Sequence, residues 1–305
     1  MKVLLTGSTG LVGKNVLEHP RIGDFEIVAP NSKELNLLNY AAVKQFLQKE
    51  QPSIIIHAAG KVGGILANTQ DPIGFLLKNL DVGRNLVWAA KQTGVKRLIN
   101  LGTSSMYPRN APNPLKEEML LTGEFEPTNE GYALAKVTVA RLCKYISQDD
   151  PDYKYKTFIP CNLYGKWDKF DPNISHMIPG IIYRIYQAKQ QNLSKIEIWG
   201  NPTTRREFLY AGDLADCLIH ALDNFDSLPL TMNVGLGFDY SVEEYYSMIA
   251  KALNYQGQFV SDDSKPVGMD KKVVDVEKLK EWGWKAKTSL EEGIKTTCDF
   301  FINQK

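Results

Sequence analysis

Short apolar runs alternate with amphipathic stretches along the first half of the chain. The runs predict buried strands at residues 2–6, 25–29, 53–59, 97–102 and 155–160, and the stretches predict helices at 11–19, 41–49, 73–93 and 130–148. Three consecutive isoleucines, Ile54 to Ile56, are typical of a strand that is covered on both faces. The alternation predicts an α/β fold, a doubly wound parallel sheet whose ligands bind at the carboxyl ends of the strands.

The alternation weakens after about residue 165. Residues 166–175 are polar and irregular and favour a loop, which a helix at 177–190 and a short strand at 196–199 follow. Ser-x-x-Glu capping boxes at Ser241 and Ser289 predict the starts of two more helices. We expect one domain of residues 1–165 plus about 206–235, and a smaller α/β domain of about 166–205 plus 236–305.

Composition excludes several classes of partner. The chain has 305 residues and a net charge of +1, which gives no bulk attraction to nucleic acid or to an anionic membrane. No apolar run approaches the roughly 20 residues that span a bilayer, and the chain starts on a strand-like run without a signal peptide. The four cysteines lack the spacing of a metal site or a disulfide framework. We therefore expect reduced cysteines, no metal and a cytoplasmic protein.

The first strand leads into a glycine-rich turn and then a helix. This context predicts a dinucleotide site, because glycines let the backbone approach the pyrophosphate and the helix N-terminus faces it. Further cofactor contacts are expected where later strands end. The expected contacts in these places are Gly7, Thr9, Gly10, Leu11, Val12 and Gly13 in the turn, Ala58, Ala59 and Gly60, and Pro160, Asn162 and Leu163.

The residues after the second strand bear on the choice of cofactor. An acid there favours NAD, whereas an Arg favours NADP. The chain has Asn31, Ser32 and Lys33 instead. With no acid the 2′-phosphate is tolerated, and with no Arg it is not strongly demanded. We expect NADPH, with NADH as an alternative.

Tyr132 and Lys136 form the candidate catalytic pair. Their spacing of four puts both side chains on one face of a helix, where a positive charge favours the phenolate and makes the phenol a better acid. The spacing alone is weak evidence, because Tyr40 and Lys44 share it. The glycine turn and the hydroxyl-rich run at 102–108 give the pair its significance.

The three glycines of the turn, Thr103, Tyr132 and Lys136 together resemble the extended short-chain dehydrogenase/reductase superfamily. Residues 58–65, 126–130, 162–165, 175–179 and 206–209 narrow the resemblance to the GDP-L-fucose synthase-like family. The resemblance implies a Rossmann NAD(P)-binding domain, a C-terminal nucleotide-sugar domain and a homodimer. It also implies an NADPH-dependent enzyme that epimerises C3 and C5 of a GDP-4-keto-6-deoxy sugar and then reduces the C4 ketone.

The resemblance assigns roles residue by residue. Tyr132 is implied to protonate O4, while Lys136 lowers the pKa of Tyr132 and holds the nicotinamide ribose. Thr103 keeps the hydroxyl that binds the ketone oxygen. His176 is implied to act as the epimerisation acid and to lie against the cofactor. The implied substrate contacts are Thr103, Ser104, Asn162, Arg184, Trp199 and Arg206.

Several positions depart from the family pattern. Ser105 stands where the family has a Cys that shares the epimerisation, and an unactivated alcohol is a poor general base. Thr9 and Ser32 stand where relatives often carry Arg, and Val267 replaces an Asp that touches the substrate. We therefore predict a C4 reductase of a GDP-4-keto-6-deoxy hexose or heptose with little or no C3/C5 epimerisation.

Two other functions stay open. One is a complete GDP-L-fucose synthase, in which His176 and another group replace the missing Cys. The other is a non-catalytic NADP-binding regulatory protein, a class that typically lacks the Tyr/Lys pair. Individual residues also have simpler explanations: His176 can be an ordinary loop histidine, Arg206 can pair with Glu207, and Trp199 can belong to the core.

Overall fold

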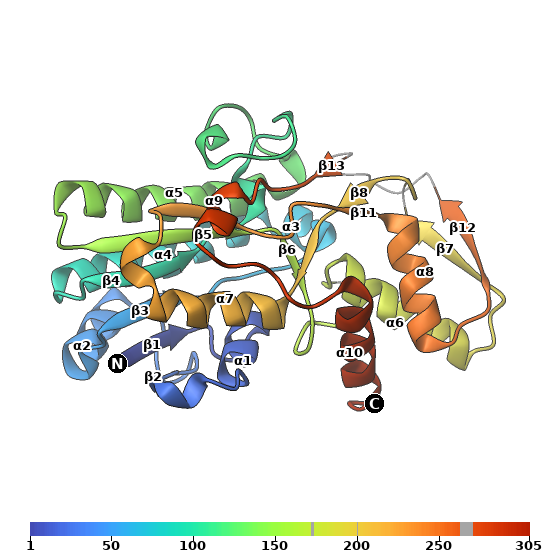
Figure 1. The fold of residues 1–305 in the computed structure, drawn as a ribbon, viewed down its shortest axis with the longest axis horizontal. Coiled ribbons are helices and arrows are strands. Elements are labelled where there is room, and N and C mark those ends of the chain that lie inside the picture. The colour runs from blue at the N-terminus through green and yellow to red at the C-terminus, as the bar shows by residue number, and fades with distance from the viewer. Residues whose placement is uncertain (172–173, 200, 263–270) are drawn as a thin grey trace.

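A six-stranded sheet forms the centre of the computed structural model, which describes residues 1–171, 174–199, 201–262 and 271–305 (Figure 1). All its pairings are parallel, and the strand order is β10-β5-β4-β3-β1-β2. The doubly wound sheet predicted from the alternation is confirmed. Its strands are β1 (Lys2–Thr6), β2 (Glu26–Val28), β3 (Ile54–His57), β4 (Arg97–Leu101), β5 (Lys154–Pro160) and β10 (Thr231–Val234).

Helices cover both faces of this sheet (Figure 1). They are α2 (Tyr40–Glu50), α4 (Pro72–Gln92) and α5 (Glu130–Asp149) on one face, and α1 (Leu11–Leu17) and α7 (Ala211–Asp223) on the other. Successive strand side chains point to opposite faces. Leu4 and Ile55 therefore pack in one apolar cluster, whereas Leu5 and Ile54 pack in the other.

Strand order reverses at β1, which has β2 on one side and β3 on the other. The loops that leave β1 and β3 approach closely: a Cβ on Gly7, whose φ is +75°, would lie 2.6 Å from the Ala58 carbonyl carbon. A Cβ on Gly13 would lie 2.2 Å from the Gly7 carbonyl oxygen, so α1 also needs a glycine there. A crevice opens at such a reversal, beyond the carboxyl ends of the strands.

A second group of elements lies at one end of the sheet (Figure 1). Its own apolar cluster joins α6 (Met177–Gln190), α8 (Val242–Leu253) and α10 (Leu290–Ile302) to β7 (Lys195–Trp199), which pairs with β12 (Gln258–Asp262). Ser241 and Ser289 cap α8 and α10 as the sequence predicts. The remaining described helices and strands are α3 (Ile65–Gln70), α9 (Glu277–Glu281), β6 (Asn162–Tyr164), β8 (Arg205–Arg206), β9 (Phe208–Tyr210), β11 (Tyr240–Ser241) and β13 (Lys271–Lys272).

Buried Glu207 ties this end of the molecule to the sheet. Its carboxylate accepts hydrogen bonds from the backbone N–H groups of Gly237 (2.9 Å), Leu236 (2.5 Å) and Val274 (2.8 Å). Burial raises the pKa of Glu207 to about 7. These bonds give Glu207 a structural role of its own, so the simple pairing of Arg206 with its neighbour is not needed to explain either residue.

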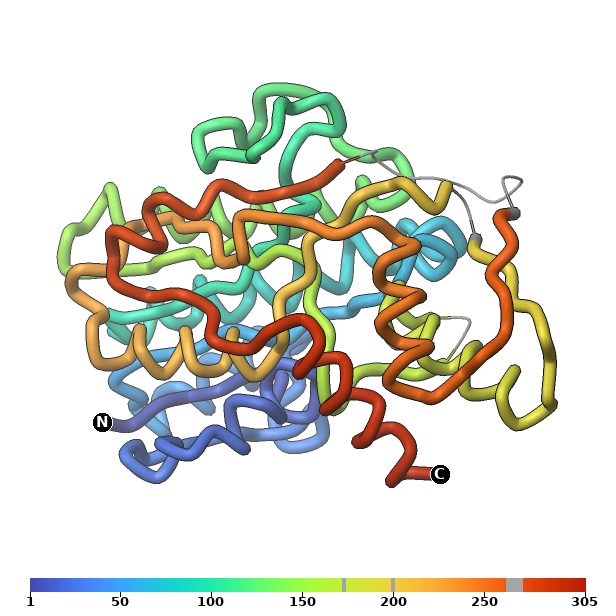
Figure 2. The backbone as a smooth tube through the Cα atoms, turned by 45° about the vertical axis from the view of Figure 1, so that its right-hand side comes forward, coloured from blue at the N-terminus to red at the C-terminus, as the bar shows by residue number. Residues whose placement is uncertain are grey.

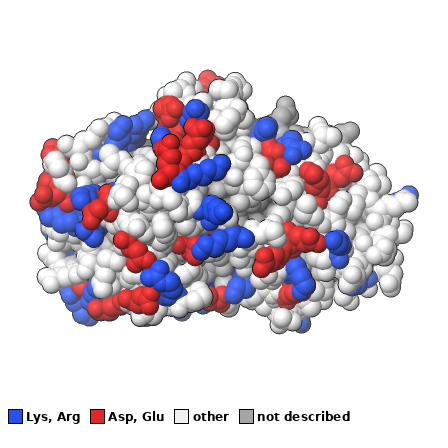
Figure 3. Space-filling model, in the orientation of Figure 1, with Lys and Arg blue, Asp and Glu red and all other residues white. Residues whose placement is uncertain are grey.

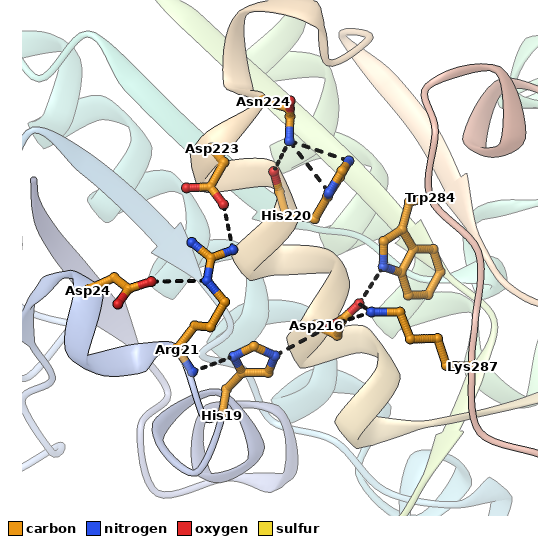
Figure 4. Close-up of polar contacts among 9 residues, drawn as sticks. All are labelled: His19, Arg21, Asp24, Asp216, His220, Asp223, Asn224, Trp284 and Lys287. Atoms are coloured by element: carbon orange, nitrogen blue, oxygen red, sulfur yellow. Dashed lines mark hydrogen bonds and ion pairs between the residues drawn. The ribbon is translucent and has the colours of Figure 1, made fainter.

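The C-terminal segment crosses the molecule twice, as the red tube in Figure 2 shows. After β13 it forms a parallel bridge between Val274 and Leu115, places α9 beside β10, and returns to α10. A polar cluster then fixes the segment to α7 (Figure 4). Asp216 accepts hydrogen bonds from Trp284 Nε1 (2.8 Å) and Lys287 Nζ (2.9 Å), and lies 3.5 Å from His19 Nε2.

Charges of both signs are mixed over the face shown in Figure 3. None of the described helices combines the length and apolar character that crossing a bilayer requires. All four cysteines are buried and unpaired. Within the described part of the chain, no three His, Cys, Asp or Glu side chains form a group that could hold a metal ion.

Candidate active site

A cleft of about 920 Å³ lies at the carboxyl ends of β1, β3, β4 and β5. It brings together most of the residues expected from the sequence. They are Gly7, Thr9, Gly10, Leu11, Val12, Asn31, Ser32, Ala58, Ala59, Gly60, Thr103, Ser105, Tyr132, Lys136, Pro160, Asn162, Leu163, His176 and Arg206. Residues up to 200 positions apart thus share one cavity, because parallel strands end at the same edge of the sheet.

Some expected residues lie elsewhere. Gly13, Lys33, Ser104 and Arg184 are not part of the cleft lining. Gly13 acts through the close packing described above, and Ser104 is buried. Arg184 points into the second group of elements, which contains α6, α8 and α10. There it donates to the Glu197 carbonyl (3.1 Å) and to the Tyr246 hydroxyl. The side chain of Trp199 and the turn at 265–268, which includes Val267, lie outside the described residues.

The turn after β2 is closed by its own hydrogen bonds. Asn31 Oδ1 accepts from the Lys33 and Glu34 N–H groups (2.9 and 3.3 Å), and Glu34 Oε2 accepts from the Asn31 N–H (2.8 Å). Asn31 and Ser32 face the cleft, whereas the Lys33 side chain is exposed outside its lining. A 2′-phosphate at this turn would meet hydroxyl and amide groups without a guanidinium.

Asn79 on α4 holds the loop after β3, a role that sequence reasoning missed. Its Oδ1 accepts from the Lys61 N–H (2.8 Å), and its Nδ2 donates to the Lys61 and Phe75 carbonyls (3.0 and 2.7 Å). A Cβ on Gly60 would lie 2.8 Å from Asn79 Oδ1. The Lys61 side chain pairs with Asp71 and lies 4.6 Å from the Phe75 ring centroid, so it is not free in solvent.

Tyr132 stands in the first turn of α5 with its ring against Phe75, edge to face at 6.2 Å between centroids. Its hydroxyl faces the Thr103 side chain, and Thr103 Oγ1 accepts from the Ser105 N–H (3.2 Å). Burial raises the pKa of Tyr132 to about 12, although the Thr103 hydroxyl lowers it. The phenol therefore keeps its proton at neutral pH.

Lys136 lies beside Tyr132, as the helix spacing predicts. Its Nζ donates to the Leu101 carbonyl (2.9 Å) and lies 6.0 Å from the Tyr132 ring centroid. The side chain is only 7% exposed, and this burial lowers the pKa of Lys136 to about 8. Burial thus acts on both groups against the charged form.

His176 is the residue before α6 and lines the same cleft as Ser105. Burial lowers the pKa of the imidazole, and the positive charge of Lys169 lowers it further. A hydrogen bond from the Gly64 N–H to the Ile174 carbonyl (3.2 Å) ties the preceding residues to the loop after β3. Because its pKa is lowered, the imidazole is neutral at neutral pH and can accept a proton.

Lys272 is a cleft residue that sequence reasoning missed. The parallel pairing of β13 with β8 sets it opposite Arg206, and both side chains line the cleft. Burial and the neighbouring Arg206 charge lower the pKa of Lys272 to about 8. Two cations held together favour an anion such as a diphosphate. No sequence signal joins them, because the two residues are far apart in the chain.

Asp168 is a third residue that the sequence did not reveal. It lines the cleft, and its Oδ1 accepts from the Lys169 N–H (2.8 Å). Its Oδ2 is buried and has no hydrogen-bond partner in the described part of the chain. Burial raises the pKa of this carboxyl to about 7. Asp168 can therefore exchange a proton near neutral pH.

Comparisons with known proteins agree with this geometry. The model of the NAD dependent epimerase/dehydratase family matches residues 3–235. A GDP-L-colitose synthase from Yersinia pseudotuberculosis is 53% identical over 305 residues, which cover 100% of this chain and 99% of the relative. A GDP-L-fucose synthase from Azorhizobium caulinodans is 46% identical over 301 residues, 99% and 96% of the two chains. The structure of a GDP-mannoheptose C4 reductase from Campylobacter jejuni with NADP bound matches with a TM-score of 0.87 and 29% identity, covering 99% and 98%.

We expect the Tyr132→Phe variant to bind NADPH normally and to lose about 10²- to 10⁴-fold in turnover, because only the proton-donating hydroxyl is removed. Single-turnover reduction measures the loss. Tyr40→Phe is the matched control, since Tyr40 has the same spacing to a lysine but lies outside the cleft lining. A Tyr132→Phe rate within a few-fold of wild type would remove Tyr132 from this role.

We expect NADPH to be preferred over NADH by a kcat/KM ratio below about 10³, which corresponds to about 4 kcal/mol. The reason is that no Arg faces the 2′-phosphate position among the described lining residues. Ser32→Arg should raise the ratio, whereas Lys33→Ala, outside the lining, should change it little. A wild-type ratio above 10³ contradicts the expectation.

Proposed function

Because this chain belongs to the NAD dependent epimerase/dehydratase family and its relatives make GDP-linked sugars, we propose that it is an NADPH-dependent C4-ketone reductase of a GDP-4-keto-6-deoxy sugar. The observation that carries the proposal is that the hydroxyls of Thr103 and Tyr132 lie together, beside Lys136, in a cleft that starts at the glycine turn. A hexose is favoured over a heptose, since the relatives at 53% and 46% identity are named for hexoses.

The residues present fit the cofactor. The close approach of Gly7 to Ala58 leaves the turn's backbone open to the cleft, and Gly10, Leu11 and Val12 line it at the start of α1. Asn31 and Ser32 would hold the adenosine end, and Lys136 would hold the nicotinamide ribose. When bound, NADPH supplies the hydride that reduces C4.

The protein's part in the reduction is to bind the ketone and to deliver a proton. Thr103 and Tyr132 donate hydrogen bonds to the C4 oxygen, which becomes negative as the hydride arrives. Tyr132 then transfers its proton to that oxygen, giving an alcohol and a phenolate. A buried phenol with a pKa of about 12 is protonated and ready to donate. The Lys136 ammonium lies near enough to stabilise the phenolate, which recovers its proton from solvent.

The other end of the substrate would be held by charge. Arg206 and Lys272 face the cleft together, and we assign the GDP diphosphate to them. The first domain, residues 1–165 plus about 206–235, then holds the cofactor and supplies Arg206. The smaller domain, about 166–205 plus 236–305, supplies Lys272, so the diphosphate is held by both. Arg184 lies outside this lining and is left out of the assignment.

Little or no epimerisation at C3 and C5 is part of the proposal. Inversion beside the ketone needs one group that removes a proton and another that returns one to the opposite face. His176 can serve one face. Ser105 is half-buried beside Thr103 and offers only an alcohol on the other. Reduction needs neither group.

A reductase that also inverts one ring carbon is the second candidate. It is favoured by Asp168, whose carboxyl has a pKa of about 7 in the same cleft, and by the 53% identical relative that bears the name of an L-sugar synthase. In that case Asp168 and neutral His176 would be the two proton-transfer groups.

One experiment tests the reaction directly. Purified protein is incubated with NADPH and GDP-4-keto-6-deoxymannose or its 3-deoxy analogue, and the products are identified by NMR. We expect a C4 alcohol from at least one substrate. Absence of any C4 reduction of both would contradict the proposed function.

Epimerisation is tested by incubation in D₂O without reduced cofactor, following the C3 and C5 protons by NMR. We expect exchange to be slow in the wild type and to appear in Ser105→Cys, because a thiol ionises far more easily than an alcohol. Fast exchange in the wild type would support the second candidate instead. Asp168→Asn and His176→Asn would then show which group moves the proton.

We also propose a homodimer formed through α4 and α5. Apolar side chains are exposed along the two helices: Ile73, Leu77 and Trp88 on α4, and Leu134 and Tyr145 on α5. Exposed apolar side chains on two helices that pack together are typical of a protein interface.

We expect Leu77→Glu to convert the dimer to a monomer, because it would bury a charge at the centre of that face. Light scattering after gel filtration measures the mass. Leu193→Glu is the control, because Leu193 is about equally exposed but lies between α6 and β7, away from these two helices. A monomeric wild type, or a Leu77→Glu dimer, would contradict the proposed interface.

A further inference from the structure

A side pocket of about 210 Å³ adjoins the cleft beside Tyr132. Four residues line both cavities: Asn68, Thr128, Asn129 and Tyr132. The pocket lies between the starts of α4 and α5, which approach so closely that a Cβ on Gly131 would be 2.8 Å from the Pro72 carbonyl oxygen. Because Tyr132 belongs to both linings, whatever fills the pocket lies next to the proposed proton donor.

Asn68 presents a buried and unused amide oxygen. The side chain is 5% exposed, and its Nδ2 donates to the Gly63 and Gly64 carbonyls (2.9 and 3.0 Å). These two bonds fix the orientation of the amide, because a flip would set its oxygen against two carbonyl oxygens. Oδ1 has no hydrogen-bond partner among the described residues.

Asn129 has a second buried amide oxygen that is not used. It is the N-cap residue of α5, a place where Asn normally accepts a hydrogen bond from the first turn of the helix. Here the side chain makes no cap bond, and its Oδ1 is buried without a partner in the described part of the chain. The local preference is overridden, which also leaves the first-turn N–H groups without a side-chain cap.

Buried amide oxygens without partners are rare, and each needs an explanation. The neighbouring hydroxyls are already in use: Thr69 donates to the Ile65 carbonyl (3.1 Å) and Thr128 to Glu126 Oε1 (3.3 Å). The rest of the lining combines Pro72, Pro127 and the rings of Phe75 and Tyr132 with the exposed Glu130. Such a pocket matches a group that donates hydrogen bonds from an otherwise apolar carbon frame.

We propose that Asn68 and Asn129 form a sugar subsite, in which their amide oxygens accept hydrogen bonds from the ring hydroxyls of the substrate. The subsite rests on the proposed function, because it lies beside the tyrosine that would protonate O4. It holds the sugar ring in register, so that the ketone meets Tyr132 and Thr103. A 4-keto-6-deoxy hexose joined to GDP has free ring hydroxyls only at C2 and C3, so one or both occupy it.

The first test is Asn129→Leu, with Asn129→Ser as a second variant should the first fail to fold. We expect kcat/KM for C4 reduction to fall about 10- to 100-fold, the usual effect of losing a buried hydrogen bond. Inhibition by free GDP and the NADPH dissociation constant should stay within about twofold. Thr69→Val is the control, because Thr69 is exposed and its hydroxyl is used by its own helix.

The second test uses substrates that lack the C2 or the C3 hydroxyl. Removing the bound hydroxyl should lower kcat/KM of the wild type about as much as the Asn129→Leu substitution does. With that analogue, the wild type and Asn129→Leu should then have equal kcat/KM. If neither analogue removes the difference, the pocket holds only water and the subsite is wrong. A kcat/KM for Asn129→Leu within threefold of wild type, or equal losses in GDP and sugar binding, would overturn it too. In each case continued C4 reduction by the wild type leaves the proposed function standing.

Discussion

The contact between two loops at the point of strand reversal is the constraint on which the site depends. The turn after β1 and the loop after β3 approach so closely that no side chain fits at Gly7. This approach fixes the floor of the cleft, and Asn79 then holds Gly60 and Lys61 in place above α4. Lys136 lies against the same loop, since a Cβ on Gly60 would be 3.6 Å from its Nζ. The cofactor floor and the catalytic pair are therefore parts of one packed unit.

Burial, more than charge pairing, sets the protonation of the groups in this unit. It raises the pKa of Tyr132 and of Asp168, and it lowers the pKa of Lys136 and of His176. Every shift favours the neutral form, as expected for groups removed from water. A cleft that favours neutral groups keeps a proton on the phenol and none on the imidazole. The phenol of Tyr132 can thus donate a proton, and the imidazole of His176 can accept one.

The sequence predicted the sheet and much of the cleft, because periodicity and strand ends are local signals. Gly7, Ala58, Thr103 and Tyr132 each follow or face the end of a strand, and all four line the cavity. Lys272 could not be found in this way, since only the pairing of β13 with β8 sets it beside Arg206. The raised pKa of Tyr132 could not be read from the sequence for a related reason. Helix spacing predicts that Lys136 lies near Tyr132. The burial of Tyr132 and the hydrogen bond from Lys136 to the Leu101 carbonyl result instead from tertiary packing.

Two parts of the cleft lining differ in chemistry. Arg206 and Lys272 face it at one place and attract anions. Asn68 and Asn129 line the cleft at another, and their buried amide oxygens have no partner among the described residues. A diphosphate is bound poorly by amide oxygens, because carbonyl groups repel its charge, and a sugar gains little from two cations. A molecule with a diphosphate at one end and a hydroxylated ring at the other matches such a lining. Under the function proposed above, the diphosphate lies at Arg206 and Lys272 and the ring lies at Tyr132, where its ketone meets the proton donor.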